Sequence, residues 1–187
     1  MDWLWCMYSA PVRMEGCSNL RGISLLGVVG KLYDRVLIKR LGAGTECAIP
    51  EEQCGFRQGR GCMDQVYSVR QVCEKYLGNE KCVFWAFMDL AKAYEKIERQ
   101  YIWQMQRVYG VRGNLLKAVQ SFYIDSRTCV RVGMDVSEYF PVNVGLRQGC
   151  VMSPWLFNVC IDGVRQRGEC KGAWKRAGTA EFKWYRA

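Results

Sequence analysis

The segment FMDLAKAYEKI, from Phe87 to Ile97, joins a short apolar run to a stretch with helical spacing. The run Lys81 to Leu90 is apolar and aromatic, and its length predicts a buried strand. This strand delivers one carboxylate, Asp89, where the chain turns toward a helix. An acid in this place can hold a divalent metal against phosphates, or it can cap the helix that follows. The pattern alone leaves both roles open.

A second block, GLRQGCVMSPWLFN, spans Gly145 to Asn158. Its glycines allow unusual backbone angles and a close approach to a ligand, and the Gln148 amide can reach a base or a sugar. The same letters also fit a tight turn that Ser153 caps, with Pro154 near the start of a last helix. The block is therefore either a binding turn or an ordinary helix entry.

Two further blocks carry positive charge. EQCGFRQGRGCMDQ, from Glu52 to Gln65, places Arg57 and Arg60 among glycines, which suits phosphate binding as well as it suits a solvated loop. Asp64 can cap the helix that follows. The block NLRGISL ends at Leu25 and is followed by a predicted helix. Arg21 in the block and Lys31 in the helix could bind a triphosphate, or they could be ordinary surface charges.

The rest of the apolar pattern alternates between helical and extended stretches, which predicts a mixed α+β fold. Glycines after the first two periodic stretches mark helix ends. The predicted helices are 28–41, 63–77, 100–109 and 115–123, and the predicted hairpin strands are 128–132 and 138–142.

Composition sets wider limits. The chain has 187 residues, half of them hydrophobic, which is enough for one core. Its net charge of +9 favours a polyanionic partner, although a basic soluble surface would look the same. An odd count of 11 cysteines, with no CxxC pair and no histidine, argues against a disulfide framework and against structural zinc. The apolar start, Met1 to Tyr8, is too short to cross a membrane. We therefore expect free thiols, an intracellular location and no membrane.

Taken in order, the four blocks resemble the reverse transcriptases of non-LTR retrotransposons, also called LINE elements. In that family the blocks read NYRPISL or NYRGISL, QxGFRxGR, FxDLxKAYD and GLRQGxxxSPxLFN. The resemblance covers Gly16 to Val164. Small departures are Leu20 for Tyr, Gly22 for Pro in many members, and Glu95 for Asp.

The resemblance implies a right-hand polymerase, with fingers, an incomplete palm and no thumb. It implies two-metal nucleotidyl transfer from dNTPs to a DNA primer on an RNA template, with Mg²⁺ or Mn²⁺. By the same match, Asp89 is a metal ligand and Tyr94 is the aromatic gate under the sugar. The remaining roles are the floor beneath nucleotide and template at Gln148 and Gly149, triphosphate contacts from Arg21 and Lys31, and template contacts from Arg57 and Arg60.

Two more metal aspartates of the family lie in a YADD or FADD turn downstream of the fourth block. No adjacent Asp pair occurs here, and Asp162 matches a position before that turn. We expect a chain that cannot polymerise. A non-catalytic nucleic-acid binder is the alternative from another class, and a chain that aggregates through unpaired strand edges is the third.

The resemblance divides the chain into an unassigned start, 1–15, a reverse transcriptase part, 16–164, and an unrelated tail, 165–187. The tail segment GECKGAWKRAGTAEFKW, from Gly168 to Trp184, has little apolar periodicity. Family members continue past this point as VREVNARVLGKGLELLS. Plausible codons for its VNARVLGKGLELL part, read one nucleotide early, give GECKGAWKRAGTA, so we hypothesise a frameshift near Val164. An ancestral element would have worked in the nucleus.

Overall fold

The computed structural model describes residues 2–8, 21–90, 92–132, 134–167 and 180–186. Helices and strands are mixed along the chain, which confirms the α+β class. The elements in chain order are β1 (Asp2–Tyr8), β2 (Arg21–Leu25), α1 (Val28–Thr45), η2 (Glu46–Ala48), α2 (Cys62–Leu77), β3 (Phe84–Leu90), α3 (Ala93–Lys96), α4 (Arg99–Val108), α5 (Gly113–Ser121), β4 (Arg127–Val132), β5 (Asp135–Val136), β6 (Phe140–Pro141), α6 (Ser153–Arg167) and β7 (Ala180–Arg186).

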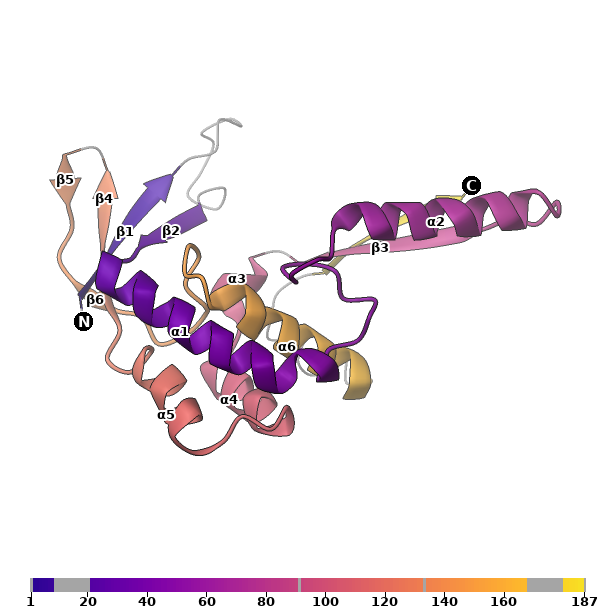
Figure 1. Cartoon of the computed structure of the whole chain (residues 1–187). Helices are drawn as coiled ribbons and strands as arrows, with labels where there is room; N and C mark the ends of the chain where they lie inside the picture. Colours follow the sequence, from indigo (N-terminus) through magenta and orange to yellow (C-terminus); the bar gives the residue numbers. More distant parts are fainter. Residues whose placement is uncertain (1, 9–20, 91, 133, 168–179, 187) are drawn as a thin grey trace.

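Helices α1, α4, α5 and α6 form the body of the molecule, with a sheet at one end (Figure 1). In that sheet the strand order is β2-β1-β4-β5, and β6 also pairs with β4. Strand β1 runs antiparallel to β2 and parallel to β4. The start of the chain, which the sequence pattern left unassigned, therefore forms a central strand of the sheet.

An arm extends from this body. Helix α2 lies along a two-stranded ribbon of β3 and β7 (Figure 1). The ribbon is antiparallel over its whole length, from Phe84 opposite Arg186 to Leu90 opposite Ala180. The tail that the sequence pattern set apart thus ends in a strand that covers one edge of β3.

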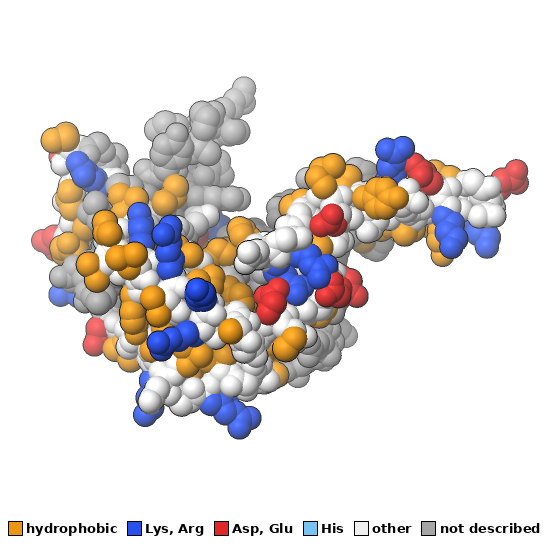
Figure 2. All heavy atoms as spheres, viewed as in Figure 1, with side chains coloured by type: hydrophobic (Ala, Val, Ile, Leu, Met, Phe, Trp, Pro, Cys, Tyr) orange, Lys and Arg blue, Asp and Glu red, His pale blue; other side chains and the backbone are white. Residues whose placement is uncertain are grey.

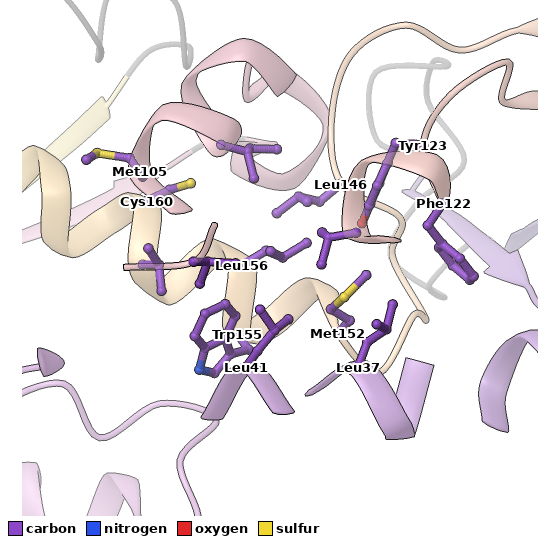
Figure 3. Packing of buried hydrophobic residues seen from close by; sticks show 14 of the residues in the cluster. Leu37, Leu41, Met105, Phe122, Tyr123, Leu146, Met152, Trp155, Leu156 and Cys160 are labelled. Atoms are coloured by element: carbon purple, nitrogen blue, oxygen red, sulfur yellow. The ribbon is translucent and has the colours of Figure 1, made fainter. Parts of the chain in front are cut away.

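The core lies between α1 and α6 and is closed by α4 and α5. Leu37 and Leu41 on α1 meet Met152, just before α6, and Trp155 and Leu156 in its first turn (Figure 3). All five are 5% exposed or less, and burial of each such side chain contributes roughly 1.5–3 kcal/mol. This packing fixes the turn that leads into α6 against the middle of α1.

The predicted helices are all present, with ends shifted by a few residues. Asp64 caps α2 as expected, because its carboxylate accepts the N–H of Gly61 at 3.0 Å. The predicted hairpin is only half correct. Strand 128–132 is confirmed in β4, whereas the expected partner 138–142 is reduced to the two-residue β6, and β5 pairs with β4 separately.

Candidate functional site

The turn Gly145 to Cys150 touches the segment that follows β3. The N–H of Gly145 donates to the Ile97 carbonyl at 2.9 Å, and the N–H of Leu146 donates to the Tyr94 carbonyl at 2.7 Å. Gly145 has a φ of +81°, and a Cβ on it would lie 2.7 Å from the Glu95 carbonyl oxygen. Only glycine combines this backbone angle with so close an approach. The GLRQGCVMSPWLFN and FMDLAKAYEKI blocks therefore meet here.

The other end of the same turn touches β2. Ser24 donates its N–H to the Gln148 carbonyl at 2.6 Å. Gly149 has a φ of +102°, and a Cβ on it would lie 2.8 Å from the Ser24 carbonyl oxygen. The turn is thus wedged between β2 and α3. The Gln148 side chain is partly exposed and Gly149 is exposed, so both can be reached from solvent.

Tyr94 lies in α3, beside this turn. Its ring stacks on Phe157 of α6, with centroids 4.5 Å apart and planes at 19°. Burial raises the pKa of Tyr94 to about 12, and its hydroxyl has no hydrogen-bond partner within the described part of the chain. The Tyr94 side chain is therefore uncharged, and its ring presents an apolar surface next to the turn.

Three of the predicted site residues are placed less fully. Asp89 lies in β3, where its register partner is Glu181 of β7, and Arg21 begins β2, but both side chains lie outside the described residues. Lys31 lies near the start of α1 and is exposed. Their roles toward metal and triphosphate stay predictions.

Arg57 is buried, and its guanidinium forms hydrogen bonds within the protein. Its Nε donates to the Glu46 carboxylate at 2.8 Å, and its Nη1 donates to the carbonyls of Pro50 at 2.6 Å and Gln53 at 3.1 Å. Arg60, by contrast, is exposed and pairs with Glu51. Arg57 thus has a structural role in addition to the template contact that the resemblance implies. The template contact stays a prediction for both arginines.

The loop that carries these arginines is held against α6. The Gln53 amide donates to Asn158 Oδ1 at 2.9 Å, and Asn158 Nδ2 donates to the Gly55 carbonyl at 2.6 Å. Asn158 is the last residue of the GLRQGCVMSPWLFN block. Its amide therefore joins that block to the basic loop, so each of the four blocks contacts at least one other.

A buried polar network supports the turn, and the sequence pattern did not reveal it. Asp34, on the inner face of α1, is fully buried and accepts a hydrogen bond from the Cys150 thiol at 2.8 Å. Burial raises the pKa of Asp34, while Cys150, Arg147 and the backbone of Val151 favour its charged form. Burial also raises the pKa of Cys150 to about 11, and the neighbouring Asp34 acts in the same direction. Cys150 is therefore a neutral thiol that donates to the carboxylate.

Arg147 is the cationic member of this network. It is 5% exposed, its Nη2 donates to Ser126 Oγ at 2.8 Å, and its guanidinium lies over the rings of Phe122 and Tyr123 at 5.0 and 5.1 Å. Burial lowers its pKa, which the charge of Asp34 partly opposes. A buried Arg that bonds to Ser126 and lies over an aromatic pair supports the turn from beneath.

Arg99 of α4 completes the support. Its Nη1 donates to the Tyr123 carbonyl at 2.9 Å, and its Nε donates to the Gly145 carbonyl at 3.4 Å. The only sequence signal for the network was Asp34 itself, an acid at helical spacing with Leu37 and Leu41. A carboxylate on a buried helix face requires a polar partner, and that requirement could have indicated that a polar network lies there.

The part of the chain that the structure describes contains no group of three or more His, Cys, Asp or Glu side chains that could hold a metal ion. Asp162, the acid that follows the fourth block, is buried in α6 and accepts a hydrogen bond from the Tyr109 hydroxyl. None of the described helices is both long and apolar enough for a membrane span.

Comparison with known proteins identifies the family. The family model described as reverse transcriptase (RNA-dependent DNA polymerase) matches residues 12–171. The chain belongs to the reverse transcriptase family. The match to the family model ends at residue 171, whereas the resemblance in the motifs ends at Val164.

Curated relatives of this reverse transcriptase chain come from mobile elements. The probable RNA-directed DNA polymerase from transposon BS of Drosophila melanogaster is 30% identical over 154 residues, which is 78% of this chain and 16% of the relative. The RNA-directed DNA polymerase from mobile element jockey, also of Drosophila melanogaster, is 28% identical over 144 residues, 75% of this chain and 16% of the relative. A Pol polyprotein from the R2 element of Popillia japonica is 25% identical over 150 residues, 80% of this chain and 21% of the relative. The resemblance to non-LTR reverse transcriptases is confirmed, and the chain spans about a sixth to a fifth of these relatives.

Proposed function

We propose that these 187 residues form the nucleotide-facing and template-facing part of a reverse transcriptase, and that alone they hold nucleic acid without extending a primer. The observation that carries the proposal is the turn Gly145 to Cys150, which contacts both β2 and α3. The turn leaves Gln148 and Gly149 accessible above a buried polar support. Rigid support of accessible groups is what precise placement of a ligand requires.

In this proposal the fingers are formed by the N-terminal blocks and the palm by β3, α3 and the turn, within residues 16–164. Gln148 and Gly149 would form the floor beneath the incoming dNTP and the RNA template, and the apolar ring of Tyr94 would pack under the sugar. Lys31 and Arg21 would contact the triphosphate. Arg60, which is exposed, suits a template contact better than the buried Arg57 does.

Asp89 is the proposed contact to a divalent metal, Mg²⁺ or Mn²⁺. A two-metal centre needs several carboxylates, which bridge the ions and offset developing charge. Since these 187 residues contain no adjacent Asp pair, they are expected to lack nucleotidyl transfer on their own. The frameshift hypothesis for the tail and the division at 1–15 and 165–187 stay proposals as well.

Primer extension tests this proposal. The purified chain is incubated with an RNA template, an annealed DNA primer, dNTPs and Mg²⁺ or Mn²⁺, beside the Asp89→Ala variant and an Asp135→Ala control, an exposed acid in β5. We expect extension at background level for all three. Extension that is lost in Asp89→Ala but kept in Asp135→Ala would show that the stretch completes a metal site, and would contradict the proposal.

The holding of nucleic acid without catalysis, which would make the chain a non-catalytic nucleic-acid binder, is favoured by the net charge of +9. It is separated from an active polymerase by salt-dependent RNA binding that survives Asp89→Ala. Absence of RNA binding by the unaltered chain at low salt would contradict the proposed holding of nucleic acid.

A further inference from the structure

Helix α1 has a buried face and an outward face of different chemistry. The buried positions are Gly30, Asp34, Leu37, Leu41 and Thr45, which recur every three or four residues and point into the core. The outward face carries the remaining charged side chains of the helix. Since Asp34 is the only acid in α1 and is buried, every exposed charge on this helix is positive.

The positive charges form a row. Lys31, Arg35 and Lys39 are exposed and four residues apart, with Arg40 beside the last of them. Successive members of such a row lie about 6 Å apart along the helix axis, from the rise of roughly 1.5 Å per residue. None of the four takes part in a salt bridge with another described residue. Figure 2 shows these blue side chains spread over α1 with no red among them.

An aliphatic row runs beside the basic one. Val28, Leu32 and Val36 are also four residues apart and are 75%, 56% and 50% exposed. Leu32 and Val36 belong to the apolar spacing that predicted the helix, yet they lie on the outward side and not in the core. Apolar side chains on the most exposed side of a helix, flanked by unpaired cations, are typical of a contact surface.

Along the chain, the basic row lies between two segments that belong to the site already described. It begins just after β2, whose Ser24 binds the Gln148 carbonyl. It ends just before η2, where Glu46 accepts from Arg57 in the basic loop. The helix has 18 residues and is roughly 27 Å long, and the basic residues from Lys31 to Arg40 cover about half of that length.

We infer that the outward face of α1 binds the phosphate backbone of a single-stranded RNA, which runs along the helix between its β2 end and its η2 end. The inference rests on the proposed function and names the surface that would hold the strand. A row one cation wide, regularly spaced, matches a linear chain of phosphates, and the aliphatic row is placed to contact sugars and bases. A lipid surface fits less well, because α1 is fixed in the core by its other face and cannot sink its apolar side freely.

Fluorescence anisotropy with a labelled single-stranded RNA, long enough to follow the whole of α1, tests the inference, using the whole chain at several salt concentrations. The row variant carries Arg35→Gln, Lys39→Gln and Arg40→Gln, and Lys31 is left unchanged because it is also the proposed triphosphate contact. The control removes the same charges elsewhere, at the exposed residues Lys75, Lys81 and Arg112, each changed to Gln. Thermal melts confirm that both variants fold.

We expect the row variant to bind RNA at least about 10-fold more weakly at about 0.1 M salt. Its slope of log affinity against log salt should become shallower by about 2, because each phosphate that a cation neutralises contributes roughly 0.7 to that slope. The control should change affinity less than about 3-fold. The same sequence as single-stranded DNA serves as the second probe, and vesicles of neutral and anionic phospholipid serve as the third.

Equal losses of affinity in the row variant and the control would overturn the inference while leaving the proposed function intact, because only net charge would then matter. Row-dependent binding to anionic vesicles without row-dependent binding to RNA would also overturn it. Row dependence for DNA but not for RNA would contradict the choice of RNA. No RNA binding by the unaltered chain at low salt would instead defeat the proposed function itself.

Discussion

Gly145→Ala is expected to lower the free energy of unfolding by about 3 kcal/mol. A left-handed backbone costs an L-residue about 1–2 kcal/mol, and overpacking adds about 1–3 kcal/mol. Both apply here, because φ is +81° and the new Cβ would lie 2.7 Å from the Glu95 carbonyl oxygen. Urea unfolding followed by circular dichroism measures the change.

Gly110→Ala is the matched control. Gly110 has a similar φ of +84°, but a Cβ there meets nothing within 4 Å. Its variant should therefore show only the backbone cost, about 1–2 kcal/mol. If Gly145→Ala and Gly110→Ala destabilise equally, the turn does not press against the carbonyls of Tyr94 and Glu95, and the described geometry is wrong at that point.

Arg147→Met should also cost about 3 kcal/mol, through a different cause. Removal of one member of a buried charged network leaves the other member without compensation, which typically costs about 3–5 kcal/mol. Here Asp34 would keep Cys150 as a donor but lose the attraction of the guanidinium. Methionine keeps much of the side-chain volume, so a cavity contributes little. Arg112→Met, at an exposed position, is the control and should change stability by less than about 0.5 kcal/mol.

The pH dependence makes this second prediction more specific. Burial already raises the pKa of Asp34 above 3.8, and removal of Arg147 raises it further. A carboxyl whose pKa is higher in the folded state than in the unfolded state binds its proton more tightly when folded. The free energy of unfolding therefore falls as pH rises from the unfolded-state pKa to the folded-state pKa. The destabilisation by Arg147→Met should therefore be larger at about pH 8 than at about pH 5. Adding Asp34→Asn should remove the pH-dependent part, and a pH-independent effect in the single variant would contradict a coupling between the two groups.

The helices could be predicted from the sequence, but not which side of α1 faces the core. The helical period was carried by Val29, Leu32, Tyr33, Val36, Leu37 and Arg40. Of these only Leu37 is buried, and the rest of the buried side of α1 is formed by Gly30, Asp34, Leu41 and Thr45. Period alone does not determine orientation when both faces carry apolar side chains. An acid on the inner face made that face look polar, and only its partners on another element explain why it is buried.

The strands were harder to predict because their partners are distant in sequence. β1 pairs with β4, from Asp2 opposite Arg127 onward, and no local pattern in the first residues indicates a partner so far away. β7 pairs with β3 from a tail whose composition lacks apolar periodicity. Sheet pairing depends on tertiary context, which short windows of sequence do not contain.

The turn of the candidate site could be predicted from the sequence, but the buried polar network beneath it could not. The glycines of the turn indicated a close approach, and the backbone angles of Gly145 and Gly149 agree with that interpretation. Arg57 shows the limit of a basic motif, because its position among glycines does not reveal that it bonds to Glu46 and nearby carbonyls. Burial and hydrogen-bond partners decide between a structural and a ligand-facing arginine, and neither can be read from spacing.

Amide hydrogen exchange at Ser24, Gly145 and Leu146, measured by NMR on the unaltered chain, tests most directly whether the sequence blocks meet at one turn. These amides donate to the carbonyls of Gln148, Ile97 and Tyr94, so each reports one contact between blocks. We predict that all three exchange about 1,000-fold more slowly than unstructured amides, in step with the buried amides of α1. Exchange of these three at rates close to those of unstructured amides, while α1 stays protected, would contradict the convergence on which the proposed function rests.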